Sequence, residues 1–165
     1  MLASHTSNLK LGCGVSPLPD LMRAGAVIGV GTDGAASNNS LDVLKEARLA
    51  ALVHKGVRRD ATTVTAVEAL EMATWGGAAA IGIERLGRLQ PGWRADLACF
   101  DLTAPHLCPG TNVYSDLVYA AQAADVTDVV IDGQLVLQDR HFPDLDVAAV
   151  LAHVRERAAR LRSLV

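Results

Sequence analysis

The sequence has little of several features that mark common protein classes. Its 165 residues contain only three cysteines, Cys13, Cys99 and Cys108, and no Cys-x-x-Cys pair, so a reducing cytoplasm is expected rather than a disulfide scaffold. Aromatic residues make up 4% of the chain and the net charge is −3, which disfavours a nucleic-acid surface. No apolar run approaches the roughly 20 residues of a membrane helix. We therefore expect a soluble globular protein with neither nucleic acid nor membrane as a partner.

Several catalytic signatures are also missing. The chain has no Gly-x-Ser-x-Gly elbow, no phosphate-binding glycine loop, and no His-x-His or His-x-x-x-His pair that would place two metal ligands together. Four histidines are therefore interpreted as structural or solvated side chains: His54, His106, His141 and His153. The role of His5, beside Ser7-Asn8 where a strand could end, stays open. Cys99 falls within a predicted strand, where a small buried hydrophobe is expected.

The first half of the chain has the alternating pattern of an α/β protein. A helix is predicted to start at Ser16-Pro17 and to stop at Gly25. The run 26–32 has no polar alternation, which is typical of a strand buried on both faces of a parallel sheet. The fold class predicted for this half is therefore α/β.

Two further helices are predicted before residue 84. The first starts near Ser40 and stops at Gly56, with an apolar line formed by Leu41, Leu44 and Leu52 beside Arg48. The second opens with the Thr65-x-x-Glu68 spacing of a capping box and breaks at Gly76-Gly77.

The second half is predicted to contain small antiparallel elements. Residues 86–89 and 95–100 resemble a strand pair, and residues 126–137 resemble a hairpin with an Asp-Gly turn. Residues 114–121 indicate a short helix. From Asp144 onward apolar residues recur at helical spacing, which predicts an amphipathic closing helix.

Asp33 is the first candidate for chemistry. It follows the predicted buried strand, and the carboxyl ends of such strands are where α/β sheets and barrels gather their active sites. An Asp-Gly pair is also an ordinary turn, so the residue type alone leaves a purely structural role open.

Three segments together resemble one family. They are Ser7-Asn8-Leu9-Lys10-Leu11, the run from Gly31-Thr32-Asp33-Gly34 to Asn39, and the run from Gly87-Arg88-Leu89-Gln90-Pro91-Gly92 to Leu97. The chain resembles the amidohydrolase superfamily, in the branch that contains 5-methylthioadenosine/S-adenosylhomocysteine deaminases and triazine hydrolases.

The resemblance implies a (β/α)₈ metal-dependent hydrolase barrel, a small antiparallel β-domain and one divalent metal, zinc or iron. Asp33 matches the aspartate at the end of the eighth strand, which would ligate the metal and accept a proton from metal-bound water during deamination of a purine-like small molecule. Asn8 and Ser37 are the implied substrate contacts, with hydrogen bonding to the backbone as the alternative.

The resemblance also implies that the chain carries only the C-terminal part of such an enzyme. Residues 1–84 match the last strands and helices of the barrel, 85–143 part of the β-domain, and 144–165 the closing helix. The family's other metal ligands lie upstream of Met1, and His5 stands in an abbreviated segment whose equivalence is open. We therefore expect the chain alone to bind metal weakly and to be inactive.

Two expectations about partners follow. The missing N-terminal part of the barrel, or a second copy paired through exposed strand edges, would complete the fold. The alternatives to an adenosine-type substrate are a triazine or guanine-type substrate, or a non-catalytic remnant that works as an interaction module or complementing half.

Overall fold

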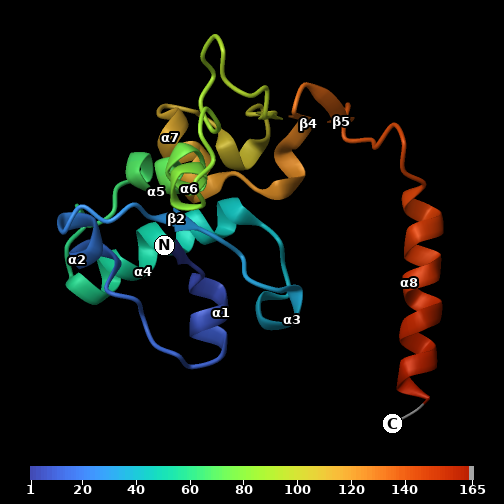
Figure 1. Ribbon diagram of the computed structural model, residues 1–165, viewed down its shortest axis with the longest axis horizontal. Helices are drawn as coiled ribbons and strands as arrows, with labels where there is room; N and C mark the ends of the chain where they lie inside the picture. Colours follow the sequence, from blue (N-terminus) through green and yellow to red (C-terminus); the bar gives the residue numbers. More distant parts are fainter. Residues whose placement is uncertain (164–165) are drawn as a thin grey trace.

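A computed structural model describes residues 1–163 and arranges the first half of the chain around two short parallel strands (Figure 1). Strand β1 (Leu2–Ala3) pairs with β2 (Gly29–Val30), with Leu2 opposite Gly29. Helices α1 (His5–Lys10) and α2 (Leu18–Arg23) lie in the connection between them, as a parallel pair requires. The predicted α/β character is confirmed, although β2 is shorter than the predicted strand 26–32.

Four helices follow β2, and the second and third of them contribute residues to the core. The core includes Leu18 of α2, Ile28 and Val30 at β2, and Ala69 and Met72 of the third of these helices. The helices are α3 (Ala35–Asn38), α4 (Val43–Arg58), α5 (Ala66–Ala73) and α6 (Trp75–Ala80). Helix α5 begins where the capping box predicts, because the Thr65 and Glu68 side chains each accept a hydrogen bond from the other's backbone N–H.

The buried face of α4 differs from the predicted one. Leu41 and Leu52 are 70% and 49% exposed, and Gly56 lies inside the helix rather than at its stop. The side chains that α4 buries are Glu46, Ala47, Ala50, Ala51 and His54. Small alanines on this face let α4 approach its neighbours closely, which leucines would prevent.

The sequence predicted a helix break at Gly76 and Gly77, but these glycines allow close packing instead. They lie within α6, and a Cβ added to Gly29 on β2 would stand 2.6 Å from the Cα of Gly77. A Cβ on Gly76 would meet the carbonyl oxygen of Glu71 at 2.8 Å. Glycine is therefore needed because α6 and β2 touch backbone to backbone.

The second half contains a three-stranded antiparallel sheet in the order β3-β4-β5. These strands are β3 (Leu97–Phe100), β4 (Val126–Ile131) and β5 (Gln134–Leu137). The predicted hairpin is confirmed, with positive φ at Asp132 and Gly133 as a type I′ turn needs. The predicted strand at 86–89 is wrong: Gly87 has φ +86° and packs against the backbone of Trp75, and β3 pairs with β4 instead.

Short helical segments link the two halves. The predicted helix over 114–121 is confirmed as α7 (Val113–Ser115) continuing into the π-helix η2 (Asp116–Ala120). Two 3₁₀ turns flank them, η1 (Pro105–Leu107) and η3 (Ala123–Asp125). Arg48 of α4 donates to the carbonyl oxygens of Val118 and Ala121, which joins the two halves.

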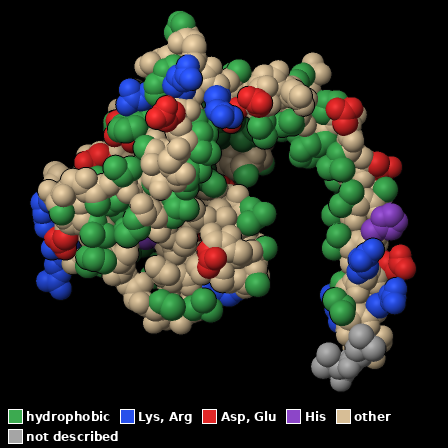
Figure 2. Space-filling model, in the orientation of Figure 1, with side chains coloured by type: hydrophobic (Ala, Val, Ile, Leu, Met, Phe, Trp, Pro, Cys, Tyr) green, Lys and Arg blue, Asp and Glu red, His purple; other side chains and the backbone are tan. Residues whose placement is uncertain are grey.

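Helix α8 (Val147–Arg162) stands apart from the rest of the molecule and buries none of its residues (Figure 1). Its hydrophobic side chains line the edge that faces the remainder of the chain across an open space (Figure 2). The accessible surface of the chain is 10582 Å², against roughly 7,800 Å² expected for a compact monomer of 17.3 kDa. The predicted closing helix is confirmed over 147–162, and residues 164–165 of the predicted range lie outside the described residues. None of the helices within residues 1–163 combines the length and apolar character needed to cross a membrane.

Candidate functional site at the carboxyl end of β2

Asp33 occupies an exposed turn just past the end of β2. Its backbone has φ +60°, a left-handed conformation that aspartate tolerates better than most residues. One carboxyl oxygen, Oδ2, accepts hydrogen bonds from the Ser7 hydroxyl at 2.7 Å and the Ser37 hydroxyl at 2.8 Å. The bonds from Ser7, Ser37 and the Gly34 backbone hold the pKa of the Asp33 carboxyl below its usual range. The group is therefore an anion near neutral pH.

The strand order explains why these three side chains meet. Ser7 lies on α1, which begins two residues after β1, and Ser37 lies on α3, which begins just after Asp33. Because β1 and β2 are parallel, the segments that follow their carboxyl ends share one edge. Of the two predicted substrate contacts, Asn8 and Ser37, the structure brings Ser37 into a hydrogen bond with Asp33. Asn8 is half-buried, has no side-chain hydrogen bond within residues 1–163, and lines a small void with His5 and Ser16.

A buried polar group behind Asp33 was missed by the sequence interpretation. Glu46 is fully buried on α4; its Oε2 accepts from the Thr6 backbone N–H at 3.1 Å and its Oε1 from Asn38 Nδ2 at 2.8 Å. The Asn38 amide also donates to the Thr32 carbonyl at 2.6 Å. The sequence does contain a signal for the burial of Glu46, because residues 46, 47, 50, 51 and 54 recur at the spacing of one helix face.

A buried histidine pair lies at the same α1–α4 contact. His5 Nε2 and His54 Nε2 are 3.1 Å apart, and both side chains are less than 5% exposed. Burial, followed by the charges of His5 and Arg58, lowers the pKa of His54 from 6.5 to about 4. Burial also lowers the pKa of His5, against the attraction of Glu46. Both rings are therefore neutral at pH 7, and the structural interpretation of His54 fits its burial.

The remaining reactive residue types lie away from Asp33. His106 on η1 contacts Asp125 on η3 at 2.9 Å. The thiols of Cys13, Cys99 and Cys108 are all exposed and free. The expectation that Cys99 is buried is wrong, because the strand β3 that carries it presents this side chain to solvent.

An apolar cavity of about 260 Å³ lies at the opposite end of β2. It is lined by Val27 and Ile28, which precede β2, and by Glu71, Met72 and Trp75 from α5 and α6. Asp33 follows the carboxyl end of the same strand, so this cavity is separate from the Asp33 site.

Comparison with known proteins decides the family. The family model for the amidohydrolase family matches residues 2–136. The chain belongs to the amidohydrolase family. A 5-methylthioadenosine/S-adenosylhomocysteine deaminase of Pelotomaculum thermopropionicum is 48% identical over 155 residues, which cover 94% of this chain and 36% of that protein. This amidohydrolase chain thus spans little more than a third of the length of the curated relative it matches.

Solved structures agree with this amidohydrolase fold. A zinc-bound adenosine deaminase from Xanthomonas campestris superposes with a TM-score of 0.95 at 44% identity, covering 98% of this chain and 37% of that one. An atrazine chlorohydrolase from Arthrobacter aurescens, complexed with zinc, gives a TM-score of 0.88 at 29% identity, covering 94% of this chain and 35% of that one. The sequence-based resemblance and the expected barrel-type fold are confirmed.

The residues of this amidohydrolase chain do not by themselves fit a catalytic metal. Within residues 1–163 no three His, Cys, Asp or Glu side chains gather where they could hold a metal ion. A catalytic zinc usually has three protein ligands and a water, whereas Asp33 offers one carboxyl whose Oδ2 is already engaged by two hydroxyls. No reaction step through a metal follows from these residues alone.

Proposed function

We propose that this chain supplies the Asp33 edge of the active site of a hydrolase that removes an amino group from an adenosine-type purine, such as 5-methylthioadenosine or S-adenosylhomocysteine. The observation that carries the proposal is the Asp33 carboxyl, held as an anion at the carboxyl end of β2 by Ser7 and Ser37. The similarity of the chain to the Pelotomaculum thermopropionicum deaminase supports the proposed substrate class.

In this proposal Asp33 transfers the proton of the reaction, first as a general base and then as a general acid. Attack of water on the carbon that bears the amino group releases one proton, and departure of ammonia requires one. Because the two hydroxyls engage Oδ2, Oδ1 is the oxygen that would accept that proton and return it to the leaving nitrogen. Ser37 restricts the rotation of the carboxyl, and Asn8 remains a proposed substrate contact.

The proposal includes one divalent metal, zinc or iron, with Asp33 as one of its ligands. Zinc in the Xanthomonas campestris and Arthrobacter aurescens structures supports it. Because the described residues hold no group of three donors, the chain alone should bind the metal weakly and release no ammonia. We also propose a cytoplasmic setting, supported by three exposed free thiols.

A second candidate function is favoured by the exposed surface. An accessible area about a third above that of a compact monomer, with an apolar edge on α8, suits a complementing half that associates with the rest of a barrel or with a second copy. The proposed regions remain 1–84 for the barrel part, 85–143 for the β-domain part and 144–165 for the closing helix.

A chimera tests the proposal. The matching segment of the Pelotomaculum thermopropionicum relative is replaced by residues 1–165, and ammonia release from 5-methylthioadenosine, S-adenosylhomocysteine and a triazine is measured. We expect activity on the adenosine derivatives, a roughly 10²–10⁴-fold loss of kcat in Asp33→Asn, and little change in Asp60→Asn. Asp60 is a matched control, because it is an exposed carboxyl whose pKa is also lowered by a hydroxyl.

Two results would count against the proposal. An active chimera that keeps its rate after Asp33→Asn would remove Asp33 from the reaction, and turnover of the triazine alone would replace the substrate class. Stoichiometric zinc together with ammonia release by the isolated chain would contradict the expected weak metal binding.

A further inference from the structure

Glu46 lies behind Asp33 and contacts both segments that carry the hydroxyls on Asp33. Its Oε2 accepts from the backbone N–H of Thr6, and its Oε1 accepts from the side-chain amide of Asn38. The two contacts join α4 to α1 and to the end of α3, between residues that are 40 and 8 positions apart in the chain. One side chain thus ties together three elements.

The partners of Glu46 are the immediate chain neighbours of the partners of Asp33. Thr6 precedes Ser7, and Asn38 follows Ser37. Ser7 and Ser37 are the two hydroxyls that hold Asp33 Oδ2, at 2.7 and 2.8 Å. A shift of the Glu46 carboxyl would therefore move both hydroxyls, one through each oxygen.

We propose that Glu46 is a positioning residue that sets the orientation of the Asp33 carboxyl through Thr6–Ser7 on one side and Asn38–Ser37 on the other. The assignment of Asp33 to the reaction rests on the proposed function, whereas the mechanical link does not. Asn38 carries a second part of the link, because its amide also donates to the Thr32 carbonyl immediately before Asp33.

Burial gives this link its stiffness. Glu46 is 0% exposed and Asn38 is 3% exposed, so neither can exchange its partners for bulk water. Glu46 also sits in the first turn of the 16-residue helix α4, whose N-terminal dipole favours an acidic group there. Glutamine has the same shape as glutamate but cannot make both contacts, because one of its two terminal groups is an amide nitrogen that donates instead of accepting.

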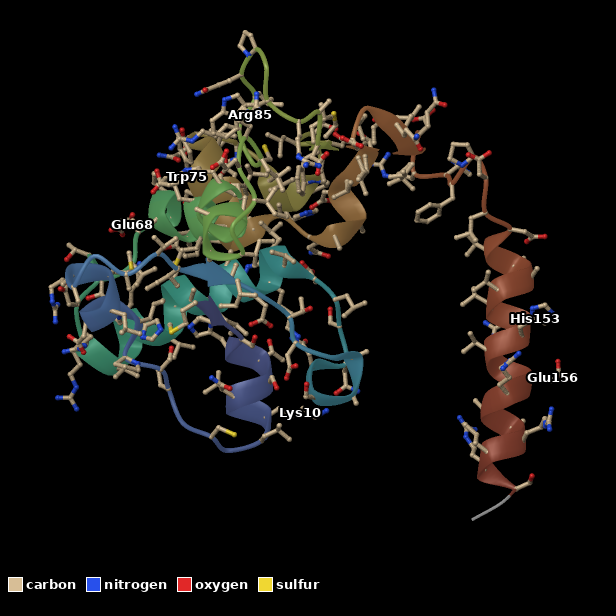
Figure 3. The ribbon with its side chains drawn as sticks, in the orientation of Figure 1. Lys10, Glu68, Trp75, Arg85, His153 and Glu156 are labelled. Carbon is tan, nitrogen blue, oxygen red and sulfur yellow. The ribbon has the colours of Figure 1, made fainter. Side chains whose placement is uncertain are left out.

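An outer tie on the same segment is solvent-exposed. Lys10, at the end of α1, reaches across to α3 and donates to the Ala36 carbonyl at 3.1 Å and to the Asn39 side chain (Figure 3). Exposed contacts of this kind hold a geometry weakly because water competes for both partners. Glu46 therefore holds this segment from its buried side, where water does not compete for the contact.

The first test uses the 165-residue chain itself and needs no activity. Backbone ¹⁵N order parameters of residues 33–39 are compared between the wild type, Glu46→Gln and the control Val118→Ala. Val118 is a fully buried core residue on η2, and the truncation removes only apolar packing there while its backbone carbonyl still accepts from Arg48. We expect values of about 0.85 in the wild type and control and below about 0.6 in Glu46→Gln.

The second test uses the chimera described above. Glu46→Gln should lower kcat by about tenfold or more and leave KM within about twofold, because misplacement of a reacting group affects the transition state more than binding. A role in stability alone would lower the melting temperature of Glu46→Gln and Val118→Ala alike without this split.

The outcomes separate the two proposals. Unchanged order parameters at residues 33–39 in Glu46→Gln, or an equal loss in Val118→Ala, would overturn the positioning role. An unchanged kcat in an active chimera would do the same. An inactive wild-type chimera would count against the proposed function alone, because the order parameters still decide on Glu46. If Glu46→Gln fails to fold, Asn38→Ala carries the same comparison, since it removes the α3 side of the link.

Discussion

Acidification should destabilise this chain through its buried histidine pair. The Nε2 atoms of His5 and His54 are 3.1 Å apart, so a single hydrogen lies between them and one ring donates while the other accepts. Two neighbouring charges act on the pair: Glu46 attracts a proton to His5, and Arg58 repels one from His54. Protonation of His54 would place a positive charge in a buried site, so the folded state binds this proton less readily than the unfolded state.

The direction and size follow from the shifted pKa. The pKa of His54 is about 4 in the folded state and 6.5 in the unfolded state, so only the unfolded state gains the proton between these values. Stability is therefore complete above pH 6.5 and is lost as the pH falls toward 4. The full difference corresponds to about 3 kcal/mol, of which about 2 kcal/mol is lost between pH 7.5 and pH 5. The lowered pKa of His5 acts in the same direction.

Urea unfolding between pH 5 and pH 7.5 measures this loss. The window lies above the ordinary carboxyl pKa values of about 4, so aspartate and glutamate contribute little. His54→Gln should flatten the dependence, whereas the control His153→Gln should keep it, because His153 is exposed on α8 and points away from the rest of the chain (Figure 3). A wild-type free energy of unfolding that is constant over this range, or an unaltered slope in His54→Gln, would refute the reasoning.

Three further predictions concern packing and charge. Leu18→Ala, at a fully buried core position, should cost about 2–5 kcal/mol in urea unfolding, and a cost below 1 kcal/mol would contradict the assigned core. Ser37→Ala should raise the pKa of Asp33, which an NMR titration of its carboxyl measures. In the wild type the folded-state pKa is lowered, so Asp33 stabilises the fold above its unfolded-state pKa. This stabilisation is lost as the pH falls through the folded-state pKa. Removal of residues 146–165 should change the melting temperature by less than about 2 °C, since α8 buries nothing; a larger fall would show that α8 packs in solution.

Local signals in the sequence predicted several elements well. The Thr65–Glu68 capping box places the start of α5 because its partners are three residues apart. The Asp132-Gly133 turn places the β4–β5 hairpin because both residues accept positive φ. In each case the residues that decide the structure are neighbours in the chain, so no knowledge of distant segments is needed.

Signals that depend on distant segments were misinterpreted. Gly76 and Gly77 resemble a helix break, yet they are in α6 because the backbone of β2 lies against them. Leu41, just before α4, and Leu52 within it suggested the wrong buried face, since the alanines that α4 does bury are small enough for close helix packing. Glu46 resembles an ordinary solvated helix residue until α1 and α3 are placed over it.

The sequence by itself determined the family, the α/β pattern of the first half and Asp33 as the candidate for chemistry, because these rest on short motifs and on the position of a carboxyl after an apolar run. Only the tertiary structure decided which side chains hold that carboxyl. Ser7 and Ser37 are 30 residues apart in the chain, and they meet on Asp33 because β1 and β2 are parallel neighbours. The scarcity of histidine pairs and aromatic residues gave no hint of this arrangement, since it is built from hydroxyls and one buried glutamate supplied by three separate helices.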